Sequence, residues 1–183
     1  MANQVYEAVR TVMAVREYQD KELPADVVRR IAEAAHLTAS AANLQPWHFV
    51  VVRERDGLRK LGSMMRTGPY IAGAAAAVIV AYEKASQFGV SDSSRAVQSM
   101  VLTAWGDGVG SNWTGFVGIE AVRKEFGLPD AYDVLAVVPL GYPKRKILGQ
   151  KKRKPFNQVV SAERFGTPLT LTDPRARARN RVD

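Results

Sequence analysis

The segment SAANLQPWHF, residues 40–49, places three short polar side chains between a helical pattern and an apolar run. Ser40, Asn43 and Gln45 can all take part in hydrogen bonds, and none of the three is an acid or a base. Residues of these types readily bond to the backbone of their own loop. The same groups, aimed outward, would bind a flat ligand with a polar edge. The segment alone leaves both interpretations open.

The other candidate residues are also binding groups rather than acids or bases. A Gly-rich turn contains Thr114 and Gly115, an early arginine stands at Arg16, and the late run KKRKP contains Lys151 and Arg153. A reaction that needs no acid or base from the protein is one in which a cofactor carries the chemistry. Flavin mononucleotide (FMN) fits this set. Its phosphate favours Arg and Lys, its ribityl hydroxyls favour short polar side chains, and its N5 favours close contact with a backbone turn.

Several other chemistries are excluded or disfavoured. Cysteine is absent, which excludes disulfides and thiolate nucleophiles. His36 and His48 have no paired carboxylates at ligand spacing, so no metal site is predicted. The chain contains neither GxxxxGK[ST] nor GxSxG. The segment GDGVGS lacks the GxGxxG spacing and follows a helical pattern instead of a strand, so we do not interpret it as a dinucleotide motif.

The spacing of apolar residues predicts the elements that position these groups. Helices are expected over about residues 4–14, 23–39, 56–66, 93–107 and 118–129, and strands over 47–53, 74–83 and 134–143. The first two strands are expected to be buried on both faces, and Gly127 to cap the last helix. Interleaved helices and strands predict an α+β or α/β sandwich.

Composition and charge are those of a globular protein with a basic end. No apolar run approaches the ~20 residues that span a membrane, and no signal-peptide pattern is visible at the start, so a cytoplasmic protein is expected. The net charge is +8, and residues from Lys144 onward contribute +9, which leaves −1 for the first 143. A basic segment of this kind binds phosphates or forms a solubilising tail. The first 143 residues are nearly neutral and contain no recognisable nucleic-acid-binding motif, so nucleic acid is not favoured as a partner.

Five segments, in this order, resemble the FMN-dependent nitroreductase family in its short form. They are AVREY (14–18), TASAANLQPWHFVVV (38–52), AVQSMVLTAWGDGVGSNWTGF (96–116), VLAVVPLGYP (134–143) and KKRKPFNQVV (151–160). The polar segment ending in Gln-Pro-Trp is the most specific of them. The resemblance predicts one nitroreductase-like FMN-binding domain over residues 1–166 and a basic C-terminal extension over residues 167–183.

The resemblance implies an α+β fold, namely a three-layer sandwich with a mixed central sheet flanked by helices. It also implies an intertwined homodimer with two FMN sites at the subunit interface, whose C-terminal segment commonly reaches across to the partner. The implied activity is that of an oxidoreductase that takes hydride from NADH or NADPH and reduces small acceptors, such as nitroaromatics or quinones, by a ping-pong mechanism. No catalytic side chain, metal or membrane association is expected.

The resemblance assigns the first cofactor-binding residues by position. Arg16 matches the second basic residue of the family's N-terminal FMN motif. Ser40 and Asn43 match a loop that reaches the cofactor, in many relatives from the other subunit, and Gln45 lies in the same motif.

The later motifs complete the assignment. Thr114 and Gly115 match the turn whose backbone faces the N5 side of the ring. Lys151 and Arg153 match the late phosphate-binding pair.

Two positions depart from the family pattern. Its N-terminal motif usually reads Arg, a variable residue, Ser, a variable residue, then Arg or Lys. Here Val12 stands in place of the first Arg and Ala14 in place of the Ser. Two expected FMN contacts are therefore missing, one of them cationic. This departure motivates an alternative hypothesis, a non-catalytic protein that binds and sequesters flavin.

Overall fold

The computed structural model describes residues 3–115, 118–147, 149 and 151–171. Contacts within the chain divide it into two compact units, Met1–Gly149 and Gln150–Asp183. The sheet and its flanking helices all belong to the first unit. The domain boundary at residue 166, which the resemblance implies, remains a prediction.

The described part of the first unit contains the five helices and three strands that the sequence predicts, and one further short strand. The helices are α1 (Gln4–Thr11), α2 (Ala25–His36), α3 (Arg55–Met64), α4 (Gly89–Gly106) and α5 (Ile119–Glu125). The strands are β1 (Trp47–Val52), β2 (Ala76–Glu83), β3 (Gly110–Ser111) and β4 (Tyr132–Gly141). Short 3-10 helices are η1 (Ala41–Asn43), η2 (Pro69–Gly73) and, in the second unit, η3 (Phe156–Gln158).

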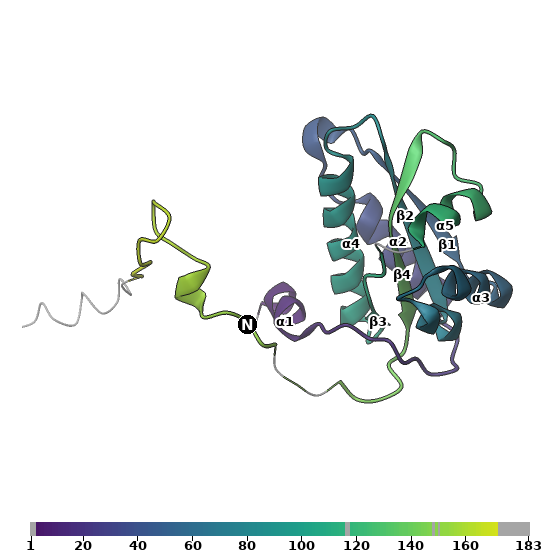
Figure 1. Ribbon diagram of the computed structural model, residues 1–183. Helices are drawn as coiled ribbons and strands as arrows, with labels where there is room; N and C mark the ends of the chain where they lie inside the picture. The colour runs from purple at the N-terminus through teal and green to yellow at the C-terminus, as the bar shows by residue number, and fades with distance from the viewer. Residues whose placement is uncertain (1–2, 116–117, 148, 150, 172–183) are drawn as a thin grey trace, which may run out of the picture. The chain divides into compact units, whose positions relative to one another are not determined.

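The four strands form one sheet in the order β1-β2-β4-β3. All pairings between them are antiparallel. A parallel element comes from the N-terminal segment, where Ala14 makes an isolated parallel bridge with Ser111 of β3. Helices α2 and α4 pack on one face of the sheet and α3 and α5 on the other (Figure 1). The fold is therefore an α+β three-layer sandwich, as the resemblance to the family implies.

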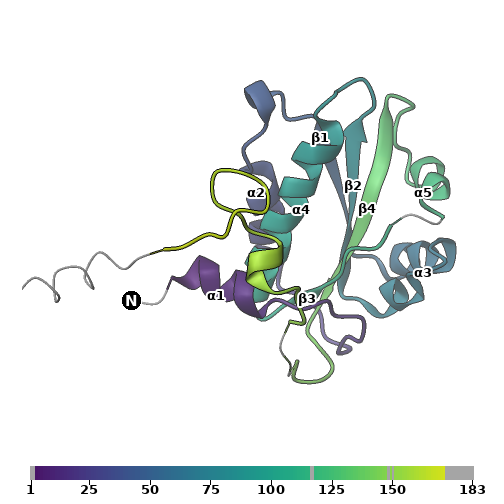
Figure 2. The ribbon, with the colours of Figure 1, turned by 60° about the vertical axis from the view of Figure 1, so that its left-hand side comes forward.

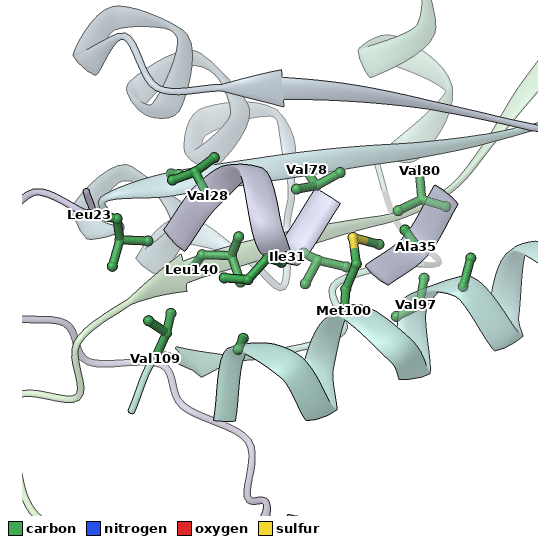
Figure 3. Packing of buried hydrophobic residues seen from close by; sticks show 14 of the residues in the cluster. Leu23, Val28, Ile31, Ala35, Val78, Val80, Val97, Met100, Val109 and Leu140 are labelled. Atoms are coloured by element: carbon green, nitrogen blue, oxygen red, sulfur yellow. The ribbon is translucent and has the colours of Figure 1, made fainter. Parts of the chain in front are cut away.

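Strand β2 lies inside the sheet and supplies both cores. Ala76, Val78 and Val80 face the cluster with α2 and α4, whereas the residues between them face α3 and α5. This alternation follows from the two-residue period of a strand. Figure 3 shows the first cluster, in which Ile31 of α2 and Met100 of α4 lie against the sheet. Both of these side chains are fully buried, so the helical spacing predicted their inward faces correctly.

The burial predicted for the strand at 47–53 is wrong. Trp47 and Val52 are buried at the two ends of β1, but His48 and Val51 are exposed. The reason is the place of β1 in the sheet, because it is an edge strand that pairs with β2 alone among the described strands. By contrast, Gly127 follows α5 with a left-handed φ of 67°, which confirms the predicted cap.

Candidate functional site

Arg16 is held at the surface by the backbone on either side of it. The N–H of Val15 donates to the carbonyl oxygen of Ser111 at 2.8 Å, and the buried Val15 side chain packs on Gly110, where a Cβ would lie 2.5 Å from Val15 Cγ2. The exposed guanidinium of Arg16 then lies 5.9 Å from the centre of the Tyr70 ring. This is within the range of a cation–π interaction.

Tyr70 also connects this arginine to the Gly-rich turn. Its hydroxyl lies 2.9 Å from Thr114 Oγ1 and accepts a hydrogen bond from Asn112 Nδ2. In the bond between the hydroxyls of Tyr70 and Thr114, either oxygen can be the donor. Asn112 and Thr114 are both buried. We call Arg16, Tyr70, Asn112 and Thr114 the Arg16 cluster.

The turn at residues 114–115 is fixed to the middle of the sheet. The backbones of Thr114 and Val137 of β4 exchange two hydrogen bonds, of 3.0 and 2.8 Å. A Cβ on Gly115 would lie 3.2 Å from Trp113 Nε1, and one on Gly68 would lie 2.6 Å from Thr114 Cγ2. Both glycines therefore let neighbouring side chains pack closely around the turn.

A cavity of about 340 Å³ lies beside Arg16. It is lined by Ala14, Val15, Arg16, Glu17, Arg145, Lys146 and Ile147. Glu17 lies 3.6 Å from the guanidinium of Arg145, so three cations face one carboxylate. The net charge of the lining is positive and suits a phosphate or another anion.

The polar segment forms a self-bonded, strained loop at residues 40–45, which we call the polar loop. Ser40 Oγ accepts the N–H of Gln45 at 3.0 Å, and Gln45 Nε2 donates to the carbonyl and side-chain oxygens of Asn43 at 3.2 and 3.3 Å. Ala42, Asn43 and Gln45 have φ values of 49°, 55° and 52°. The loop therefore bonds to itself, as the first interpretation of its sequence expects. Asn43 and Gln45 are nevertheless exposed to solvent, so their side-chain amides can also meet a ligand.

The polar loop and Arg16 lie toward opposite ends of the sheet, and Thr114 of the Arg16 cluster lies between them, bridged to Val137 in the middle of β4. The loop leads into Trp47, which pairs with Tyr82 near the end of β2. Ser111 accepts the N–H of Val15, the residue before Arg16. Ser111 pairs with Leu140, which in turn pairs with Ala76 at the start of β2. Tyr82 is six residue steps along the strand from Ala76, which is roughly 20 Å. Figure 2 shows the loop before β1 and the segment after α1 at the two ends of the sheet. One copy of the chain does not bring the two groups together.

Lys151 and Arg153 belong to the second unit. Arg153 is exposed and donates from Nη1 to the carbonyl oxygen of Lys152 at 2.8 Å. Partial burial, followed by repulsion from Arg153, lowers the pKa of Lys151. Their assignment to a cofactor phosphate remains a prediction.

The two histidines lie outside these groups. His36 and His48 are exposed, and the His48 ring makes an edge contact with Tyr132, with 6.2 Å between ring centres. Within the described ranges, no group of three His, Asp or Glu side chains could hold a metal ion. No helix in the described part of the chain is long and apolar enough to cross a membrane.

Sequence reasoning missed four residues of this region. Arg145 and Lys146 follow directly on the PLGYP strand, and their proximity to that motif was an available signal. Asn112 lies inside a matched segment next to the Gly-rich turn. Tyr70 had no such signal, because it is 44 residues from Thr114 in the chain.

Comparison with known proteins shows the family to which the chain belongs. The chain matches a family model described as "Putative TM nitroreductase" over residues 4–173. A relative from Methanothermobacter thermautotrophicus, described as "Putative NADH dehydrogenase/NAD(P)H nitroreductase", is 37% identical over 147 residues, which are 76% of this chain and 77% of the relative.

Solved structures show the same fold. A crystal structure from Bacteroides thetaiotaomicron, under that same description, has a TM-score of 0.83 at 28% identity and covers 90% of this chain and 100% of its own. An "FMN-dependent Nitroreductase" from Clostridium difficile has a TM-score of 0.80 at 22% identity, with 86% and 98% covered. The family match spans nearly the whole chain, including the five segments quoted from the sequence, so this protein belongs to the nitroreductase family.

Proposed function

We propose that the protein is a homodimeric, FMN-dependent oxidoreductase that uses NADH or NADPH to reduce small acceptors, such as nitroaromatics or quinones, by a ping-pong mechanism. Its membership of the nitroreductase family makes it an oxidoreductase in general terms. FMN dependence is stated for one structural neighbour, and NAD(P)H for the relative from Methanothermobacter. The observation that carries the proposal is the Arg16 cluster beside a basic cavity.

The residues of this region fit FMN in their chemistry. The phosphate carries about two negative charges, and the cavity offers the cations of Arg16, Arg145 and Lys146. Ala14, which replaces the family's serine, lines the same cavity. Val12 stands where the family usually has an arginine, and Arg145 and Lys146 would supply positive charge in its place. Lys151 and Arg153 are proposed as further phosphate ligands from their position in the family pattern.

The protein's part in the reaction would be binding and orientation. When bound, FMN supplies the redox chemistry, which is hydride acceptance from NAD(P)H and electron transfer to the acceptor. Thr114 and Gly115 would hold a backbone turn close to the ring, because both are buried and Thr114 is hydrogen-bonded to β4. Tyr70 would hold Thr114 and Arg16 in place. No protein acid or base is needed for these roles.

A second copy of the chain would complete the site. A two-fold axis places the same surface of each copy against the other, so the polar loop of one copy can reach the Arg16 cluster of its partner, twice. Helix α1 supplies an apolar surface for such an association, since Val5, Tyr6 and Val9 are 68%, 61% and 44% exposed. Ser40 and Asn43 would then contact the flavin from the partner side.

A visible absorption spectrum of the freshly purified protein tests the proposal. We expect flavin bands that bleach when NADH or NADPH is added without oxygen, and that return when a nitroaromatic or a quinone is added. Bands that persist with both donors would contradict the reductive half-reaction. A colourless protein that cannot be reconstituted with FMN would overturn the cofactor.

A further inference from the structure

Asp92 is a buried carboxylate that belongs to none of the groups described so far. It lies in the first turn of α4 and is fully buried. Its Oδ2 accepts the N–H of Ala41 at 3.0 Å, and its Oδ1 is paired with the partly exposed Arg95 one turn along the helix. The N-terminal end of a helix also stabilises a negative charge. The carboxylate is thus compensated within α4 while it holds the backbone of another segment.

The segment that it holds is the polar loop, whose backbone is strained. Three residues with side chains, Ala42, Asn43 and Gln45, have positive φ, a conformation that costs an L-residue free energy. Such conformations persist only where the surroundings over-determine them, and they occur at ligand clamps. Two bonds hold the strained stretch: Ala41, just before it, donates to Asp92, and Gln45, its last residue, donates to Ser40.

We propose that Asp92 is a positioning residue that holds the polar loop in the conformation in which it contacts the flavin of a partner copy. This inference rests on the proposed function of the loop. A hydrogen bond to an ionised acceptor is stronger than one to a neutral acceptor. Without it, the loop relaxes toward unstrained conformations, and cofactor binding must order it again, which weakens affinity.

The tether is tested first without cofactor, by amide hydrogen exchange of the FMN-free protein. In the wild type we expect the Ala41 amide to be protected, and rapid exchange there would overturn the proposal without any variant. In Asp92→Asn the amides of residues 41–45 should exchange faster. The matched control is Asp130→Asn, which breaks another Asp–Arg pair, that of the exposed Asp130 with Arg123, and should leave these amides unchanged.

Cofactor affinity gives the second readout. Asp92→Asn should raise the dissociation constant of FMN about tenfold, while Asp130→Asn leaves it unchanged. At saturating FMN, kcat should stay within about twofold of wild type, because Asp92 does not touch the reacting atoms. Unchanged affinity in Asp92→Asn would overturn its role. A wild type that binds no FMN would instead overturn the proposed function, and this role with it.

A rescue separates strain from general damage to α4. Glycine adopts positive φ readily, so adding Ala42→Gly to Asp92→Asn should restore much of the lost FMN affinity. A helix damaged by the loss of Asp92 would not be repaired by a change in the loop. If the double variant binds FMN as weakly as Asp92→Asn, the strain mechanism is wrong.

Discussion

Tyr70 acts through two parts of its side chain, and substitutions can separate them. Tyr70→Phe removes the hydroxyl that serves Asn112 and Thr114 but keeps the ring beside Arg16. Because both partners are buried, we expect a loss of about 1–3 kcal/mol in the free energy of unfolding, measured with urea. Tyr70→Leu should also lose FMN affinity, since the ring is gone.

Tyr132→Phe is the control for the loss of the Tyr70 hydroxyl. The Tyr132 hydroxyl makes a longer contact of 3.3 Å with the exposed Glu83, so its removal should cost less than about 0.5 kcal/mol. An equal loss in Tyr70→Phe and Tyr132→Phe would show that the hydroxyl of Tyr70 does not organise the cluster.

The phosphate assignment of the second unit can be tested with neighbouring cations. Arg153→Ala should weaken FMN retention by roughly 1.5–3 kcal/mol, which is the value of one charge-assisted hydrogen bond. Lys154→Ala, one residue further on, should have little effect because the family pattern gives it no role. An unchanged FMN dissociation constant in Arg153→Ala, measured by fluorescence titration, would show that the assignment is wrong.

Tyr18 makes stability depend on alkaline pH. Burial, the largest cause, raises the pKa of its hydroxyl, which donates to the carbonyl oxygen of Val15 at 2.7 Å. The folded state therefore retains the proton more strongly than the unfolded state. Its contribution is complete below the ordinary tyrosine pKa of about 10 and is lost as pH rises above that value. Urea unfolding should show this decline in the wild type and a smaller one in Tyr18→Phe.

Among the elements, β3 sets the position of Arg16 because Gly110 of β3 packs closely against Val15, the residue before Arg16. A Cβ on Gly110 would lie 2.5 Å from Val15 Cγ2, so Gly110→Ala should push the segment after α1 off the strand. We expect a destabilisation of about 1–3 kcal/mol and weaker FMN binding. Gly106→Ala, at the end of α4 with no atom near the added methyl, should be neutral or slightly stabilising. Similar losses in both variants would contradict this account.

The elements also show what the sequence can and cannot predict. The helices and long strands follow from local periodicity, so Ile31 and Met100 were placed in the core correctly. Edge position is a property of the whole sheet, and for this reason the exposure of His48 was missed. The two-residue strand β3 exists only because β4 lies beside it. Motif order supplied the segments of the candidate site, whereas Tyr70 lies beside Thr114 only in the folded chain and comes from a segment that carries no motif.

At the scale of the whole molecule, the separation of the polar loop from Arg16 predicts complementation between damaged subunits. Asn43→Ala and Arg16→Ala should each weaken FMN binding in their own homodimer. In a mixed dimer, one site contains both substitutions and the other contains neither. Random mixing of equal amounts by co-refolding should therefore leave about a quarter of all cofactor sites free of both substitutions.

Turnover at low FMN, measured before and after mixing, checks this prediction. Each variant refolded alone gives the baseline, and a chromatographic mass of twice the chain supports the dimer. No gain on mixing would mean that both residues serve the same copy's cofactor, or that no cofactor is shared.

The edge position of β1 has a consequence for the behaviour of the protein during synthesis. The strand WHFVVV is six residues long, has high β propensity and carries no acidic side chain, Lys or Arg. Its outer row of backbone groups has no strand partner within the described residues. An open edge of this kind is a template for intermolecular strand addition. Arg53 and Glu54 follow directly, at the position where charged gatekeepers limit such addition, so we expect resistance to aggregation to depend on residues outside the candidate site.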